Sequence, residues 1–259
     1  MTAVQQRNLV TPSPVFYGLV TVTVGLGVLL WKNYEFNGIT LFLFVISGWI
    51  LSLAFHEFGH ALVAYMGGDR SVVEKGYLTL DVRRYVEVRT SLLFPILILV
   101  LGGIGLPGGA VWINTHAIRS PMMRSLMSAA GPAASGICAL ICLLPIRAGM
   151  IDFDNHRLFL LGLGFLGAIQ VIAMIFNLVP VPGLDGFGII EPFLSNETRR
   201  SLQPARQYGI MIFIAAIWFV PSVRDAFWSI TDVFTEAIGG PDIPFLRSAG
   251  FREFQFWER

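Results

Sequence analysis

Long apolar runs recur along this chain and are the feature that most restricts its fold. A helix needs roughly 20 mostly apolar residues to cross about 30 Å of hydrocarbon, and five runs approach or exceed that length, while a sixth is a weak candidate. The runs are Val15–Trp31, Ile39–Met66, Ser91–Leu106, Met123–Ile146, Leu158–Val181 and the weak Tyr208–Pro221. Because helices satisfy their own backbone inside lipid, about six such segments predict an all-α, multi-pass membrane protein.

Composition supports a membrane protein and gives no sign of a nucleic-acid-binding protein. The mean hydropathy is +0.67 and 14% of the residues are charged, whereas soluble proteins carry about a quarter. The formal net charge is +1, and no basic run exceeds the pairs Arg83-Arg84 and Arg199-Arg200, so nothing indicates nucleic-acid binding. The two cysteines, Cys138 and Cys142, lie in an apolar run and are interpreted as small core residues. We therefore expect the partners to be in the lipid bilayer.

The polar segments between and after these runs suggest smaller features. Residues 77–82 and 85–88 alternate in polarity, which predicts a small membrane-associated β element after the second apolar run. Near the C-terminus, four apolar residues recur at helical spacing and predict an amphipathic helix ended by Gly239-Gly240-Pro241: Phe227, Ile230, Phe234 and Ile238. Without repeats or a linker, we expect one membrane domain, 1–221 with its core at 39–192, and an amphipathic tail, 222–259.

The candidate chemistry begins inside the second apolar run, at His56-Glu57-Phe58-Gly59-His60. Residues four apart share a helix face, so both imidazoles can reach one zinc ion while Glu57 takes a proton from bound water. Ionisable groups inside a membrane helix are costly and usually functional. The alternative is a polar cluster that only bonds to neighbouring helices.

A catalytic zinc takes three protein ligands and one open position, so a third ligand is required. Most acidic and histidine candidates lie in polar connections, where solvation explains them: Asp69, Asp81, His116, Asp152, Asp154, His156 and Glu191. Asp185 differs because it follows Pro180, Pro182 and Gly183 at the broken end of an apolar helix, where irregular backbone is tolerated beside a cavity. Its alternative role is to cap the following turn.

Topology restricts how these residues can meet. His56 and His60 fall late in their run and Asp185 follows its own, so the two helices must run parallel. If both apolar runs between these helices crossed the bilayer, Asp185 would lie on the opposite face from the histidines. One of the two should therefore not cross, and we predict that the short, glycine-flanked Ser91–Leu106 is re-entrant. With that choice, and with the four arginines of the C-terminal tail left aside, eleven Lys and Arg residues face one side and three face the other, which predicts a site open to the cytosol. The eleven are Arg7, Arg70, Lys75, Arg83, Arg84, Arg89, Arg119, Arg124, Arg199, Arg200 and Arg206, and the three are Lys32, Arg147 and Arg157.

These motifs together resemble the site-2 proteases, a family of intramembrane zinc metalloproteases. His56 through His60 match the family's zinc helix, and Asn177 through Gly186 match its N-x-x-P-x-P-x-L-D-G signature. The resemblance covers about residues 47–192. It implies that His56, His60 and Asp185 bind one Zn²⁺, that Glu57 is the general base, and that Asn177 positions the substrate or the oxyanion.

One position departs from the family pattern. The family commonly has G-P-x-x-N on the intervening helix, and this chain has Ser135 at the asparagine position, after Gly131-Pro132. A hydroxyl is shorter than an amide and carries a single donor. Ser135 therefore either keeps a substrate or oxyanion role or simply permits close helix packing, which we favour slightly.

The function that we expect from the sequence is hydrolysis of peptide bonds in transmembrane proteins, within a multi-pass protein of a prokaryotic cell membrane. By the resemblance, substrates are membrane-bound signalling regulators that another protease has already cut. Two alternatives stay open. A zinc-binding membrane protein without proteolysis would not need Glu57, and a transporter would also place ionisable groups and broken helices in the bilayer.

Overall fold

Four long helices dominate the structure, a computed structural model that describes residues 11–33, 37–85 and 112–258. They are α2 (Pro14–Trp31), α3 (Asn37–Gly67), α7 (Pro121–Arg147) and α8 (Phe153–Leu178). Each is long and apolar enough to cross a membrane. Over the residues that the structure describes, the prediction of an all-α membrane protein is confirmed.

Side-chain caps fix where three of these helices begin. The hydroxyls of Ser13 and Ser120 accept backbone N–H groups from the first turns of α2 and α7, and Pro14 and Pro121 occupy the first helical positions. The Asp152 carboxylate caps α8 in the same way. Such caps satisfy donors that no helical carbonyl can reach, and proline suits a first position because it has no N–H to satisfy.

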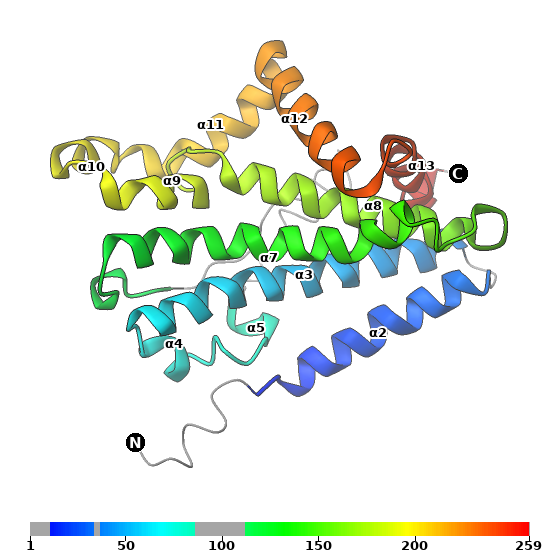
Figure 1. The fold of residues 1–259 in the computed structure, drawn as a ribbon, viewed down its shortest axis with the longest axis horizontal. Coiled ribbons are helices and arrows are strands. Elements are labelled where there is room, and N and C mark those ends of the chain that lie inside the picture. The colour runs from blue at the N-terminus through cyan, green and yellow to red at the C-terminus, as the bar shows by residue number, and fades with distance from the viewer. Residues whose placement is uncertain (1–10, 34–36, 86–111, 259) are drawn as a thin grey trace.

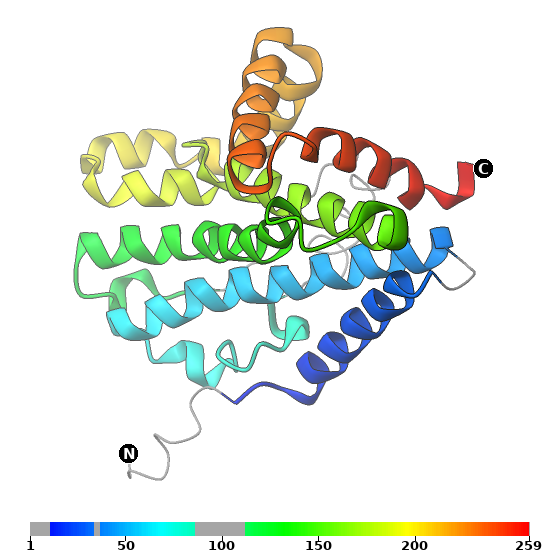
Figure 2. The same cartoon turned by 45° about the vertical axis from the view of Figure 1, so that its right-hand side comes forward.

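The helices α3, α7 and α8 form the centre of the molecule. Buried residues make up 83% of the most apolar stretch of α8 but only 17% of the most apolar stretch of α2. Helix α2 leans away from α3, and the gap widens toward the N-terminal end of α2 (Figures 1 and 2). Figure 1 shows that α3 and α8 run in the same direction and α7 runs opposite to both. The parallel arrangement that the sequence required is therefore present, and α3 and α8 end on the same side.

The predicted number of about six spans is not supported. The segment Ser91–Leu106, predicted to be re-entrant, lies outside the described residues, and Tyr208–Pro221 is not an independent span. It falls in α11 (Ala205–Phe219), which meets α12 (Pro221–Gly239) at a bend of 95°. Pro221 has no N–H group to donate to a carbonyl of α11, and Val220 before it is extended (φ −112°, ψ 103°), so α11 ends here. The described residues thus hold four candidate spans, or five if the bent pair counts as one.

The predicted β element is wrong over residues 77–85, and residues 86–88 lie outside the described residues. The segment contains α4 (Ser71–Glu74), α5 (Val82–Tyr85) and tight turns between them. Positive φ angles at Gly76 (73°) and Leu80 (54°) interrupt any extended run. Alternation failed as a signal because neighbouring residues are buried together: Tyr77, Leu78, Leu80 and Asp81 are each at most 7% exposed.

The predicted C-terminal helix is confirmed as α12, which ends at Gly239 as expected. Its buried residues include Phe227, Thr231 and Thr235, whereas Ile230 and Phe234 are exposed. The chain continues as α13 (Ile243–Phe254), which packs on α8, and η4 (Phe256–Glu258). Short helices gather where α3 and α8 end (Figure 1): η2 (Thr115–Ala117), α9 (Asp185–Ile190), η3 (Glu191–Phe193) and α10 (Asn196–Leu202).

Candidate zinc site

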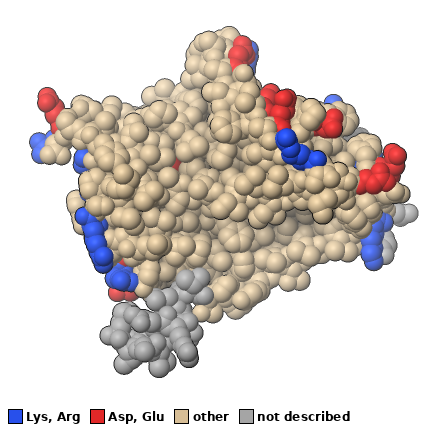
Figure 3. Space-filling model, in the orientation of Figure 1, with Lys and Arg blue, Asp and Glu red and all other residues tan. Residues whose placement is uncertain are grey.

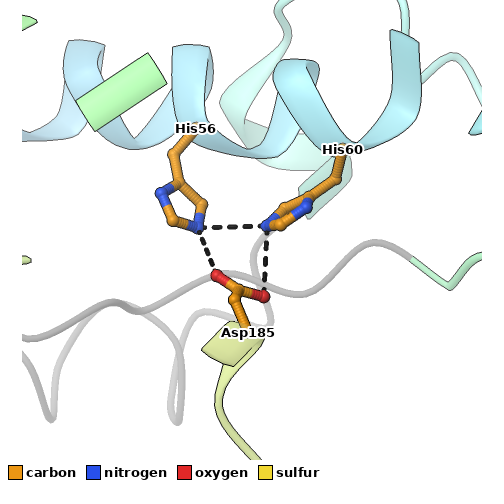
Figure 4. A group of neighbouring side chains, drawn as sticks. All are labelled: His56, His60 and Asp185. Atoms are coloured by element: carbon orange, nitrogen blue, oxygen red, sulfur yellow. Dashed lines mark hydrogen bonds and ion pairs between the residues drawn. The ribbon is translucent and has the colours of Figure 1, made fainter. Parts of the chain in front are cut away.

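Three predicted side chains meet where α3 lies beside the start of α9. The Nε2 atoms of His56 and His60 are 3.2 Å apart, and they lie 3.2 and 3.4 Å from the two carboxylate oxygens of Asp185. Figure 4 shows both imidazoles pointing from one face of α3 toward this carboxylate. Residues 129 positions apart in the chain therefore converge on one point.

The chain after α8 is shaped to bring Asp185 to this point. Helix α8 ends at Leu178, and Gly183 adopts φ +103°, which side-chain-bearing residues rarely adopt. Gly186 packs so closely on the end of α8 that a Cβ would lie 2.2 Å from the Leu178 carbonyl oxygen. Asp185 is the first residue of α9 and directly follows Leu184, the N-cap residue of that helix.

Hydrogen bonds from α7 orient both imidazoles. His60 Nδ1 lies 2.8 Å from the Met127 carbonyl oxygen, which can only accept, so Nδ1–H donates and Nε2 keeps a lone pair. His56 Nδ1 lies 3.0 Å from Ser135 Oγ, and the same tautomer lets it donate to that hydroxyl. Partners of this kind fix ring orientation in metal sites.

The Asp185 carboxylate lies between two buried imidazoles. Both histidines are at most 6% exposed. A buried carboxylate facing two imidazole nitrogens provides the donor types that bind zinc.

A pocket of about 390 Å³ opens onto these groups. Glu57 and Asn177 line it with the three clustered residues, and they are 3% and 4% exposed. The Asn177 amide donates to the Ala173 carbonyl on its own helix at 3.1 Å. The pocket therefore offers space beside both Glu57 and the imidazoles.

The spacing of this cluster is compatible with one shared zinc ion. Zinc bonds of about 2.0–2.1 Å place tetrahedral ligand atoms roughly 3.3–3.4 Å apart. The two Nε2 atoms are 3.2 Å apart and each lies 3.2–3.4 Å from a different oxygen of Asp185, and one ligand atom from each residue lies within 4.8 Å of the others. In the part of the chain that the structure describes, this is the one group of three or more His, Cys, Asp or Glu residues spaced to hold a metal.

Five of the seven other candidate third ligands have different partners. Asp69 accepts from the backbone of Ser71 and Asn114, and Asp81 pairs with Arg83. Glu191 pairs with Arg206, His156 bonds the Trp31 carbonyl, and Asp152 caps α8.

The contribution of α7 was not foreseen from the sequence. The Met127 carbonyl gave no signal because any residue supplies one. Gly131 lies against the imidazoles, where a Cβ would be 2.2 Å from His60 Nε2. Packing was placed only slightly ahead of a substrate or oxyanion role for Ser135, and neither interpretation included the contact of its hydroxyl with His56. The G-P-x-x-S motif held both residues, but a motif does not state which atoms it contacts.

Comparison with known proteins identifies relatives over nearly the whole chain. The chain is 40% identical over 255 residues to "Putative zinc metalloprotease Rip2" of Mycolicibacterium smegmatis, covering 97% of this chain and 96% of that protein. The Rip2 protein of Mycobacterium tuberculosis H37Rv is also 40% identical over 237 residues, 89% of each chain. "Putative zinc metalloprotease YwhC" of Bacillus subtilis is 26% identical over 212 residues, 80% of this chain and 94% of that one.

No protein-family model matches the chain, and no solved structure matches it. The curated relatives cover the helix that bears His56 and His60 as well as the segment that bears Asp185. With the zinc-compatible cluster and the long apolar helices, they settle the class: this membrane protein is a zinc metalloprotease and belongs to the site-2 protease family.

Proposed function

We propose that this protein hydrolyses peptide bonds of transmembrane proteins, with His56, His60 and Asp185 as zinc ligands and Glu57 as general base. The observation that carries the proposal is the convergence of three ligand atoms within 4.8 Å of one another, in a pocket that Glu57 also lines. A buried glutamate next to a histidine pair has a clear use in proteolysis, and simple metal storage would not require it.

The chemistry divides between the metal and this chain's own residues. When bound, zinc lowers the pKa of a water molecule toward neutrality and polarises the scissile carbonyl. Glu57 accepts the proton that the attacking water loses and returns it to the leaving amine. Met127 and Ser135 keep the imidazoles in place during both transfers, because their oxygens accept from the two Nδ1–H groups.

The pocket restricts the form in which a substrate can bind. A helical peptide bond has its carbonyl and N–H engaged in the helix, so a membrane-spanning substrate must unwind locally before Glu57 and the ligands can act on it. Asn177 lines the pocket, where its side-chain carbonyl oxygen can accept a hydrogen bond from an extended strand. Its amide N–H bonds Ala173. We assign Asn177 a role in positioning the substrate.

The proposed site opens toward the cytosol of a multi-pass protein in the cell membrane. Lys and Arg residues accumulate on the connections at the zinc end of the bundle, which the positive-inside rule places in the cytosol. Figure 3 shows charged residues toward both ends of the long helices and an uncharged belt between them. We retain the division into a protease domain, 1–221, and a tail, 222–259, as part of this proposal.

Replacing Glu57 tests the proposal. The Glu57→Gln variant keeps the side chain's shape but cannot accept a proton, so cleavage should fall by about 10²- to 10⁴-fold while zinc stays bound. Glu74→Gln is the matched control, because Glu74 is an exposed glutamate on α4. Membrane proteomes of cells that carry each variant would be compared for a substrate that accumulates.

Two results would reject the proposal. Unchanged cleavage by Glu57→Gln would remove the general base. Purified protein without bound zinc under metal-replete conditions would remove the metal mechanism.

A further inference from the structure

A polar cleft of about 560 Å³ adjoins the zinc pocket. The two share Thr115, Met127 and Ser128 as lining residues, so one begins where the other ends. Nine of the twelve residues that line the cleft are polar, and they come from η2, α7, η3, α10, α11 and the adjoining turns. Its ionisable residues are Arg124, Arg199, Arg200, Arg206, His116 and Glu191.

The positive charge in this cleft is largely uncompensated. Its one carboxylate, Glu191, pairs with Arg206, and Arg199 donates to the backbone carbonyls of Pro192 and Leu194. Within the described ranges, neither Arg124 nor Arg200 forms an ion pair. The Nε–H group of Arg124 is buried without a hydrogen-bond partner among the described residues. A buried unpaired donor destabilises the fold, so an acceptor that enters the cleft would satisfy Arg124.

Helix stability does not explain two of these arginines. Arg124 lies in the first turn of α7 and Arg206 in the first turn of α11, where the positive end of the helix dipole disfavours a cation. Arg199 and Arg200 differ, because they lie in the last turn of α10, where the dipole favours a cation. The N-terminal ends of α7 and α11 therefore add to the positive potential of Arg124 and Arg206.

We propose that this cleft binds acidic side chains of the substrate segment that flanks the scissile bond. The inference rests on the proposed proteolytic function. An extended peptide advances about 3.3 Å per residue, so a strand held at the zinc pocket reaches the adjoining cleft within a few residues. Arg124 and Arg200 would bind its carboxylates, because guanidinium groups form paired hydrogen bonds with them. Glutamate or aspartate on that flank thereby becomes a specificity determinant.

The continuity of the cleft with the zinc pocket favours a peptide over a phospholipid headgroup. The two share Thr115, Met127 and Ser128 as lining residues, so a substrate strand bound at the zinc pocket continues into the cleft. A lipid headgroup would have no reason to bind at this junction.

Direct binding measurements test this inference separately from proteolysis. Two fluorescent peptides would share an apolar half and end in a run of glutamates or of glutamines. Fluorescence anisotropy would report their binding to full-length Glu57→Gln protein in neutral detergent, so that neither probe is cut. We expect the glutamate peptide to bind at least about tenfold more tightly, and about fivefold more weakly after Arg124→Gln or Arg200→Gln.

Arg252→Gln is the charge-matched control, because Arg252 is exposed on α13, far from the cleft along the chain. Equal binding of the two peptides, or the same weakening in Arg252→Gln, would overturn the inference. Displacement of the glutamate peptide by short-chain phosphatidylglycerol, with no effect of short-chain phosphatidylcholine, would assign the cleft to a lipid instead. None of these binding results depends on whether wild-type protein cleaves peptides. Failure of this inference can therefore be distinguished from failure of the proposed proteolytic function.

Discussion

Replacing Gly131 with alanine should disable the metal site without unfolding the protein. A Cβ at this position would lie 2.2 Å from His60 Nε2 and 2.6 Å from His56 Nε2. Carbon and nitrogen atoms normally approach to about 3.5 Å, so the overlap is roughly 1 Å. Zinc–ligand distances tolerate changes of only about 0.2 Å. Either the imidazoles rotate away from the metal or α7 moves away from α3, and both outcomes displace a ligand.

The energetic cost should therefore appear mainly in zinc binding. Overpacking typically costs about 1–3 kcal/mol of stability, which most folds survive. Loss of an orienting partner alone weakens metal binding by about 10- to 100-fold, and displacing a ligand should exceed that range. The assay is zinc affinity of purified Gly131→Ala, measured against a competing chelator, together with its thermal unfolding.

Gly136→Ala provides the matched control on the same helix. Its new Cβ would meet only the Met174 sulfur, at 2.9 Å, and a flexible thioether can move aside. We expect nearly normal zinc affinity in this variant. Normal zinc affinity in Gly131→Ala would show that α7 does not lie against the imidazoles, and the geometry of the site would then be wrong.

Two further substitutions test individual hydrogen bonds, one beside the zinc ligands and one between Arg83 and Asp81. Ser135→Ala removes the acceptor for His56 Nδ1–H, so a chelator titration should give about tenfold weaker zinc binding, restored in Ser135→Thr; unchanged affinity in Ser135→Ala would reject this role. The hydrogen bond from Arg83 holds the pKa of Asp81 below its ordinary value of 3.8. Asp81 therefore stabilises the fold above that value and stops doing so as pH falls through the lower folded pKa. In thermal unfolding of chelator-treated protein, Asp81→Asn should be less stable at neutral pH and should lose less stability below about pH 4; parallel profiles would contradict this.

The sequence predicted the long helices well because lipid imposes a simple rule. A backbone without water must be satisfied within its own helix, so length and hydropathy alone locate segments such as α3 and α8. The need for one ion to contact His56 and Asp185 then required these helices to be parallel, as they are in the structure. Chemistry thus supplied a distance restraint that hydropathy could not.

The failures occurred where tertiary contacts decide the structure. Residues 77–85 alternate like a strand, but burial of consecutive side chains and a left-handed Leu80 produce turns instead. In α12, Thr231 is fully buried and Ile230 is 48% exposed, the reverse of what apolar spacing suggests in water. The Thr231 hydroxyl donates to the Phe227 carbonyl of its own helix, so its burial leaves no unsatisfied donor, and apolar spacing alone did not identify the packed face of α12.

The role of α7 follows from the register between two antiparallel helices. Met127, Gly131 and Ser135 are spaced by four residues and so form one stripe of α7, and His56 and His60 form the facing stripe of α3. Met127 contacts His60 and Ser135 contacts His56, with Gly131 between them against both rings. A shift of one helical turn would remove Gly131 from the rings and break both hydrogen bonds at once. The zinc site therefore requires one particular packing of α3 on α7, although α7 itself contributes no ligand.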